Sequence, residues 1–292
     1  MSRYGATLRE KLLTALMVCF GLLMLFPLIV TFTNSFMSEA EIALRYTSRL
    51  NTFDIVDGIT RRFIDMGVIP QRVTVEQYTE VLINQPSFMI LLTNSLRLTL
   101  PVVAGSLIVS ALTAYGFTIW RFRFKEAVFT VYIVVMLMPL QAVLVPNFII
   151  ADMMGIRESY LAIILPGIFS PFGVFLMRQS MKIIPQAYFE AARIDGASEW
   201  YIFLHVVMPQ LKSSIAALAM LTFIEYWNIV EQAIIFITDY RQEPLSVYLS
   251  RIAAGRMGLV FAVSCIYMFL PLWFLIVGQK DLKKGIELSG VK

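Results

Sequence analysis

The chain has 292 residues, of which 58% are hydrophobic and only 15% charged, and its formal net charge is +4. This composition excludes an ordinary soluble domain, and the length suits one bundle of several membrane-spanning helices. The charge does not indicate nucleic-acid binding, because the basic residues lie beside hydrophobic segments and form no separate stripe. Cys19 and Cys265 lie in apolar runs and His205 is the only histidine, so the sequence predicts neither a disulfide nor a metal site.

Six segments are apolar enough to span a bilayer, which takes roughly 20 residues. They are 12–32, 88–120, 127–150, 161–177, 213–238 and 259–278. No small-residue cleavage site follows the first segment at signal-peptide distance, so we expect it to be retained. Pro139 and Pro146 are expected to bend the third segment. We therefore predict an all-α integral membrane protein with six transmembrane helices. Its parts are an N-terminal segment 1–11, a first span 12–36, an external loop 37–87, a core 88–278 and a tail 279–292.

Charge sets the expected orientation of these spans. The short turn at 121–125 holds Arg121, Arg123 and Lys125, and the tail after residue 278 is rich in lysine. Short loops with a positive charge stay in the cytoplasm. With six spans, both termini and the polar segment at 186–209 are then expected to be cytoplasmic.

The segment at 186–209 predicts two short helices joined by a turn. Pro185 can start a helix over 186–195, and Gly196 fits the left-handed position that follows a helix end. Ser198 is a suitable N-cap for the second helix, and Pro209 is expected to break it. Helical spacing places one apolar face on this second helix, consisting of Trp200, Phe203, Leu204 and Val207.

A wider pattern runs through this segment. Glu190, Ala191 and Ala192 are followed after three residues by Gly196, and after nine more by Val206-x-Met208-Pro209. This pattern resembles the EAA loop of ABC-importer permeases, which usually has Ile and Leu where this chain has Val206 and Met208. The string EAARIDGA at 190–197 is similar to the carbohydrate-uptake branch, the relatives of the maltose permease's G subunit. NSLRLTL at 94–100, AYGF at 114–117, MPLQAVLVP at 138–146 and FLMRQSM at 175–181 agree with it.

The resemblance implies a type I ABC-importer permease fold in the bacterial inner membrane, with 186–209 as a cytoplasmic coupling loop. It implies four kinds of partner: a second homologous permease, two ATP-binding subunits, an external solute-binding protein and a sugar substrate. The chain has no GxxxxGK[ST] motif, so we expect no enzymatic activity and no cofactor in it, with ATP and Mg bound by the partner ATPases. The resemblance gives the ATPase contact to Glu190, Ala191, Ala192, Asp195, Gly196 and Ala197.

The fifth segment contains polar residues that are costly in a bilayer and that usually face a cavity or a partner helix. Glu225 and Asn228, with Glu231 further on, are spaced to lie broadly on one side of a helix. Tyr226 adds an aromatic face. Sugars are bound by such aromatic faces and by amide or carboxylate hydrogen bonds, so these residues are candidates for the substrate pathway, together with Gln141 and Asn147. Helix–helix pairing is the alternative explanation for each polar residue.

The tail resembles the C-terminal ending of the same family, which in relatives reaches the ATPase dimer. This resemblance makes Gln279, Lys280 and Gly285 candidate contact residues. The alternative is a basic tail held at anionic lipid headgroups. For the whole chain, two alternatives to a sugar importer stay open. One is an ABC importer for a non-sugar solute such as glycerol phosphate or a polyamine. The other is an autonomous ion-coupled carrier that uses Glu225 and Glu231.

Overall fold

The computed structural model describes residues 8–47, 54–56, 59–61, 67–251 and 257–288. Residues 1–7 of the predicted N-terminal segment, parts of the external loop and residues 289–292 of the predicted tail lie outside this description. The chain forms two compact units. Unit 1 comprises Met1–Phe88 and Arg251–Met268, and unit 2 comprises Met89–Ser250 and Phe269–Lys292.

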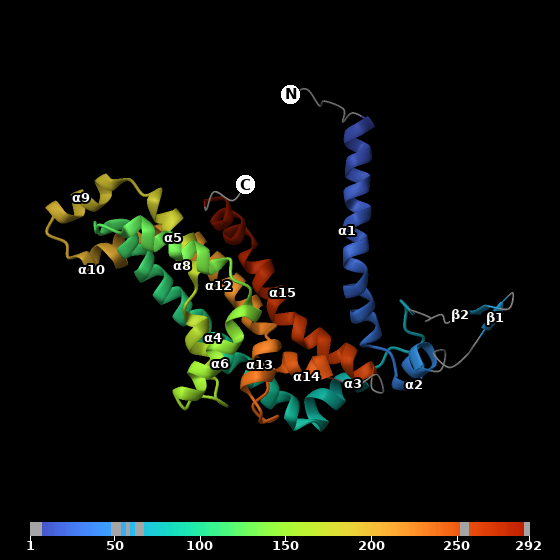
Figure 1. The fold of residues 1–292 in the computed structure, drawn as a ribbon. Coiled ribbons are helices and arrows are strands. Elements are labelled where there is room, and N and C mark those ends of the chain that lie inside the picture. The colour runs from blue at the N-terminus through green and yellow to red at the C-terminus, as the bar shows by residue number, and fades with distance from the viewer. Residues whose placement is uncertain (1–7, 48–53, 57–58, 62–66, 252–256, 289–292) are drawn as a thin grey trace. The chain divides into compact units, whose positions relative to one another are not determined.

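Unit 1 contains the first long helix and the predicted external loop (Figure 1). The loop holds short elements and one antiparallel hairpin, which is an exception to the predicted all-α fold. The Glu41 carboxylate organises part of it, accepting from the Gln71 N–H at 2.9 Å and pairing with Arg45 at 2.9 Å. The elements are α1 (Leu8–Asn34), α2 (Glu39–Ile42), η1 (Ala43–Thr47), β1 (Asp54–Val56), β2 (Ile59–Arg61), α3 (Glu76–Thr79) and η3 (Glu80–Asn84).

Helices are the only regular elements among the described residues of unit 2, and the helices of the predicted coupling loop (186–209) lie at one end of the bundle (Figure 1). The helices are α4 (Pro86–Ile119), α5 (Lys125–Met136), α6 (Leu140–Met153), α7 (Leu161–Ile168), α8 (Pro171–Lys182), α9 (Gln186–Ile194), α10 (Glu199–Tyr201), η4 (Ile202–Val207), α11 (Met208–Gln210), α12 (Lys212–Trp227), α13 (Glu231–Phe236), α14 (Leu245–Arg251) and α15 (Met257–Leu288). The helices α4, α14 and α15 each contain residues of both units.

Among the described residues, four stretches are long and apolar enough to cross a membrane: Arg9–Asn34, Pro86–Ile119, Leu161–Lys182 and Met257–Gly285. They correspond to the predicted first, second, fourth and sixth spans. The number rises to six if each of two bent helix pairs counts as one span. One of these pairs is α5 with α6, bent by 103°. The bend lies at Pro139, which precedes α6 with an extended ψ of 144°, whereas Pro146 lies inside α6.

The predicted fifth span is not one helix, and this corrects the sequence-based interpretation. The helix α12 ends at Trp227, Asn228 is its C-cap, and Glu231 begins the separate helix α13. The Asn228 side chain donates to the Ile224 carbonyl at 2.8 Å. Such a local side-chain bond competes with helix continuation. Glu225 and Glu231 therefore lie on different helices, and the argument that one helix face carries them fails.

The main core of unit 2 lies beneath the coupling loop. Its buried members come from α4, α8, the coupling loop and α12, and include Tyr115, Met177, Phe189, Val207 and Leu218. The helices α5 and α8 are joined by Arg178, whose side chain is only 1% exposed. Its guanidinium donates to Glu126 at 2.5 Å and lies 3.8 Å from the centre of the Phe129 ring.

Candidate functional site

The coupling loop begins with α9, as the sequence predicts. Pro185 precedes the helix with φ −59° and ψ 136°, and the helix ends one residue short of the predicted 186–195, with Asp195 as its C-cap. A proline suits this place because the first helical N–H groups have no partner within the helix. Phe189 is the buried residue of α9 and belongs to the main core, which fixes the helix to the bundle by one face.

The turn after α9 is built around Gly196, whose φ of +79° lies in the left-handed region. The Ala197 N–H donates to the Ala192 carbonyl at 3.0 Å, and the Gly196 N–H donates to the Arg193 carbonyl at 3.1 Å. This pair of bonds is the Schellman motif, which satisfies carbonyls left over at a helix end. The role predicted for Gly196 in the turn is therefore confirmed.

The second helix also starts where predicted, since the Ser198 hydroxyl accepts from the Tyr201 N–H at 3.2 Å. Its buried face agrees with the predicted one only at Phe203 and Val207. Ile202, Phe203 and Val207 are buried, whereas Trp200 is 59% exposed and Leu204 is 41% exposed. The reason is the π-helical stretch η4 at Ile202–Val207, whose i→i+5 bonding changes the spacing on which the prediction relied.

Pro209 does not end this second helix, contrary to the prediction. It lies in the first turn of the short helix α11, where a proline needs no N–H bond. The chain bends by 76° only after Gln210, between the stretch Glu199–Gln210 and α12. The coupling loop therefore runs into α12 with a break at Leu211.

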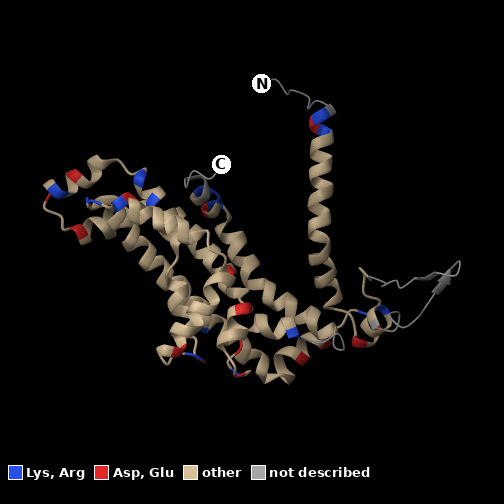
Figure 2. Cartoon of the chain, in the orientation of Figure 1, with Lys and Arg blue, Asp and Glu red and all other residues tan. Residues whose placement is uncertain are grey.

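The outer surface of the coupling loop is both charged and apolar. Figure 2 shows charged residues along α9 and α10. Of the six predicted contact residues, Ala192 and Ala197 are half-buried against the main core, and the others are exposed: Glu190, Ala191, Asp195 and Gly196. Sequence reasoning missed Ile194, which is 85% exposed beside them. A large apolar residue within the polar EAARIDGA string was the available signal.

A polar tie fastens the loop to the bundle, and the sequence did not reveal it. The Tyr115 hydroxyl on α4 donates to Glu199 Oε2 at 2.7 Å. The Arg193 guanidinium on α9 donates to Glu199 Oε1 at 2.8 Å. Both bonds favour the charged carboxylate, so Arg193 and then Tyr115 lower the pKa of the Glu199 carboxyl below its usual range. The carboxylate therefore links α9, α10 and α4.

The candidate substrate residues are only partly brought together. The Gln141 amide on α6 donates to Glu231 Oε2 at 3.2 Å, which joins α6 to the start of α13. Tyr226 is half-buried and packs against Gly167 on α7, where an added Cβ would lie 2.6 Å from the tyrosine oxygen. Glu225 and Asn228 are exposed, and Asn147 is half-buried on α6. Helix–helix pairing, the alternative weighed above, applies to Gln141 and Glu231.

The tail continues the last helix instead of leaving it at residue 278. Gln279 and Lys280 are exposed on α15. Gly285 is buried against α12, because an added Cβ would lie 2.7 Å from both the Ala217 Cβ and the Ser213 carbonyl oxygen. The described part of the tail thus contacts α12 through Gly285.

The described residues contain no group of three or more His, Cys, Asp or Glu side chains that could hold a metal ion.

Known proteins agree with the resemblance in the sequence. The lactose transport system permease protein LacG of Rhizobium radiobacter is 31% identical over 202 residues, covering 68% of this chain and 74% of that protein. The arabinooligosaccharides transport system permease protein AraQ of Bacillus subtilis is 24% identical over 283 residues, covering 96% of this chain and 95% of that protein. The sn-glycerol-3-phosphate transport system permease protein UgpE of Pectobacterium atrosepticum is 29% identical over 208 residues, covering 70% of this chain and 74% of that protein.

A solved structure shares the fold. It is a bacterial ABC transporter involved in the import of the acidic polysaccharide alginate, with a TM-score of 0.78 and 22% identity, and the match covers 94% of this chain and 98% of that one. The family described as the binding-protein-dependent transport system inner membrane component matches residues 106–279. That range is more than half of the chain and includes the whole coupling loop, and the chain belongs to this family.

Proposed function

We propose that this chain is the permease subunit of an ATP-driven importer for a sugar or oligosaccharide. Family membership supports the permease role. The lactose and arabinooligosaccharide permeases among its relatives support a carbohydrate substrate. In this proposal a second homologous permease completes the pathway through the inner membrane, two ATP-binding subunits supply energy, and an external binding protein delivers the solute. A structure of the alginate transporter was solved in complex with a periplasmic protein that holds an alginate pentasaccharide, which fits that arrangement.

The observation that carries the proposal is the architecture of the coupling loop. Its underside is buried through Phe189, Ile202 and Val207, while Glu190 and Ile194 remain exposed on top. A short helix with an apolar anchor and a charge at its rim suits a groove on a partner protein. In the proposed mechanism, closure of the ATPases moves this loop as a body. The bend at Leu211 passes the movement to α12, which tilts around a site near the α12–α13 break.

The proposed topology has six spans with both termini in the cytoplasm, because the positive turn at 121–125 and the lysine-rich tail favour that side. Reporters fused after Lys292 and inserted near Asp57 test it, and both positions lie outside the described residues. The first reporter is expected to be cytoplasmic and the second external. Finding both on one side of the membrane overturns the topology.

The proposed transport activity is tested by reconstitution. The chain is assembled with its sister permease, ATPases and binding protein in vesicles, and uptake of labelled lactose and arabinooligosaccharides is measured with ATP. Uptake that requires ATP and the binding protein supports the importer. Uptake by this chain alone, driven by an ion gradient, overturns it in favour of an autonomous carrier.

A second candidate is an importer for glycerol phosphate, which is favoured by the 29% identity to the UgpE permease. The polar residues near the α12–α13 break include Glu225 and Glu231 but no basic residue. Carboxylates there repel a phosphate, so we favour the neutral sugar. Measuring the uptake of labelled glycerol 3-phosphate by the same vesicles distinguishes the glycerol phosphate importer from the sugar importer.

A further inference from the structure

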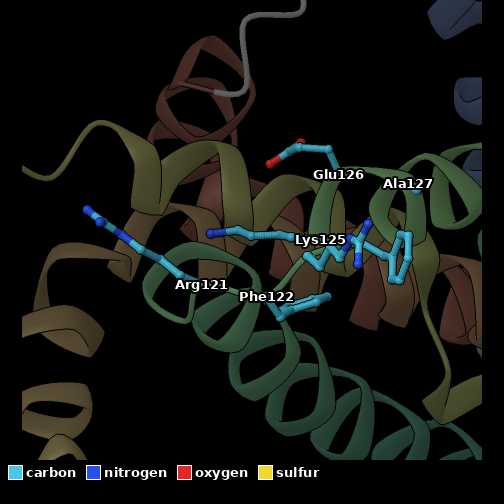
Figure 3. Close-up of a pocket in the computed structure, with 7 residues that line it drawn as sticks. Arg121, Phe122, Lys125, Glu126 and Ala127 are labelled. Atoms are coloured by element: carbon cyan, nitrogen blue, oxygen red, sulfur yellow. The ribbon is translucent and has the colours of Figure 1, made fainter.

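The turn between α4 and α5 forms a shallow pocket that the import function does not use. The helix α4 ends at Ile119 and α5 begins at Lys125. The pocket has a volume of about 550 Å³, and its lining residues are Arg121, Phe122, Arg123, Phe124, Lys125, Glu126 and Ala127. Figure 3 shows the side chains of Arg121 and Lys125 extending toward the same side of the turn.

The positive charges of this pocket are not neutralised within unit 2. Within the described part of the chain, Arg121 and Arg123 have no carboxylate partner. The Lys125 ammonium donates to the Thr118 and Trp120 carbonyls, each at 3.1 Å, and these acceptors are neutral. Three cations around one hollow attract an anion.

The single acid of the lining does not cancel this charge. The Glu126 carboxylate accepts from the buried Arg178 at 2.5 Å. The charges of Arg178, Lys182 and Lys125 all act on Glu126, and Arg178 has the largest effect. The carboxylate is therefore already paired, and the pocket stays positive.

The surroundings of the pocket identify the kind of anion. Three large aromatic residues are exposed around it: Trp120 at 62%, Phe122 at 45% and Phe124 at 64%. The turn joins α4 to α5, two strongly apolar helices. Tryptophan gathers at the level of lipid headgroups, and Trp and Phe beside Lys and Arg are typical of segments that lie at the membrane interface. A lipid covers these rings with its acyl chains and supplies a phosphate to the cations.

We propose that this pocket binds the phosphate of an anionic phospholipid from the leaflet next to the turn. The guanidinium groups of Arg121 and Arg123 donate to the phosphate oxygens, and Lys125 adds a point charge. The start of α5 adds to the attraction, because its N-cap Phe124 offers no side-chain acceptor and helix N-termini favour anions. This lipid site goes beyond the proposed function and does not depend on which solute is carried.

The test uses the purified full-length chain and native mass spectrometry. Dioleoylphosphatidylglycerol is titrated to find a saturable site, with dioleoylphosphatidylcholine as the neutral comparison and inorganic phosphate as the free anion. The pocket variant is Arg121→Gln with Arg123→Gln. The matched control is Arg72→Gln with Arg241→Gln, which removes two exposed charges outside both the pocket and the basic tail. Each basic residue near a membrane surface contributes about one kcal/mol, so the pocket variant should lose roughly tenfold to thirtyfold in affinity.

The proposal expects that the control binds phosphatidylglycerol as the natural chain does and that phosphatidylcholine binds weakly to both. Equal losses in the pocket and control variants indicate general charge attraction and overturn the site. Competition by inorganic phosphate at the same concentration as the lipid overturns the lipid assignment in favour of a free anion. Unchanged lipid binding together with weakened ATPase copurification assigns the pocket to a protein partner. None of these results depends on transport, so they leave the proposed import function to its own test.

Discussion

The hydroxyl of Tyr115 donates to Glu199 Oε2 at 2.7 Å, which fastens the start of α10 to α4 across 84 positions of the chain. The same carboxylate holds Arg193 of α9 through its other oxygen. The Tyr115 ring lies 5.2 Å from the Phe203 ring, centre to centre. The coupling loop is thus held to α4 by a hydrogen bond to a carboxylate and by an aromatic contact.

Removal of the Tyr115 hydroxyl should loosen the loop without unfolding the bundle. In Tyr115→Phe the ring contact with Phe203 remains, and one hydrogen bond worth about 1 kcal/mol is lost. We expect faster amide hydrogen exchange in residues 198–207 of the purified chain. Tyr132→Phe is the control, because the Tyr132 hydroxyl makes no hydrogen bond among the described residues. Equal exchange rates in the two variants show that the tie does not hold the loop.

Local signals predicted the turn of the coupling loop, and tertiary contacts explain what the sequence missed. Each of the residues Pro185, Gly196 and Ser198 acts on the backbone within a few positions of itself. The sequence alone therefore indicates where the helices of the loop start and end. The buried face of the second helix was predicted correctly only at Phe203 and Val207, because the prediction assumed 3.6 residues per turn where η4 is π-helical. The pairing of Tyr115 with Glu199 leaves no local pattern, because it joins distant parts of the chain.

The fifth segment shows a second limit of periodicity. An apolar stretch at 213–238 predicts one span, but Asn228 bonds to the carbonyl four residues earlier and ends α12. The mean hydropathy of the segment does not reveal that bond, because one asparagine side chain changes the average little. The charge pattern at 121–125 was visible, whereas the pairing of Glu126 with a buried arginine 52 positions away was not.

Gly196→Ala should strain the turn that carries the predicted ATPase-contact residues. The space around Gly196 is open, with no atom within 4 Å of an added Cβ, so the cost comes only from its φ of +79°. A left-handed conformation costs an L-residue roughly 1–2 kcal/mol. We expect Gly196→Ala to lower the thermal stability of the purified chain measurably, and Gly196→Asn to lower it less, because asparagine tolerates this conformation. Gly21→Ala, also in open space, is the control. If Gly196→Asn lowers the thermal stability as much as Gly196→Ala does, the strain argument is contradicted.

Gly285→Val should separate the end of α15 from α12. The added side chain meets the Ser213 carbonyl oxygen at 2.7 Å, and backbone atoms cannot turn aside as a flexible side chain can. Overpacking of this kind costs about 1–3 kcal/mol. A lower thermal unfolding temperature of the purified chain measures the effect. Lys284→Val, at the neighbouring exposed position, should change it little. If both variants unfold alike, the tail does not depend on this contact, and the interpretation of Gly285 as an ATPase contact gains weight.

Asn228→Ala should weaken transport if the α12–α13 break borders the solute. A hydrogen bond to a neutral partner contributes about 0.5–1.5 kcal/mol, so the apparent KM for the sugar should rise roughly twofold to tenfold. The measurement is uptake by the reconstituted complex with several sugars. A contact with solute changes KM to a different extent for each sugar, whereas a purely structural cap lowers the yield of folded protein and leaves KM alone. Asn84→Ala, in the predicted external loop, is the matched control.

Glu190→Ala should weaken ATPase docking without unfolding the permease. Glu190 is exposed at the outer side of α9, so its loss should hardly affect the stability of this chain alone. At a partly desolvated interface, truncating one member of a hydrogen-bonded charge pair costs about 2–5 kcal/mol. That exceeds the roughly 1.4 kcal/mol that corresponds to a tenfold change in affinity. We therefore expect lost copurification of the ATPase subunits, or ATP hydrolysis that no longer drives uptake.

Two further variants make the Glu190 test sharper. Glu190→Arg should be worse than Glu190→Ala, because the new charge repels a basic partner, and reversing the charge of that partner should restore function. Glu76→Ala removes an equally exposed carboxylate from the predicted external loop and should leave copurification unchanged. Because Ile194 lies exposed beside Glu190, Ile194→Ala should weaken docking as well, through lost apolar burial. Normal copurification and transport by both Glu190 variants would make Glu190 a solvated surface residue and remove the charge from the proposed ATPase contact.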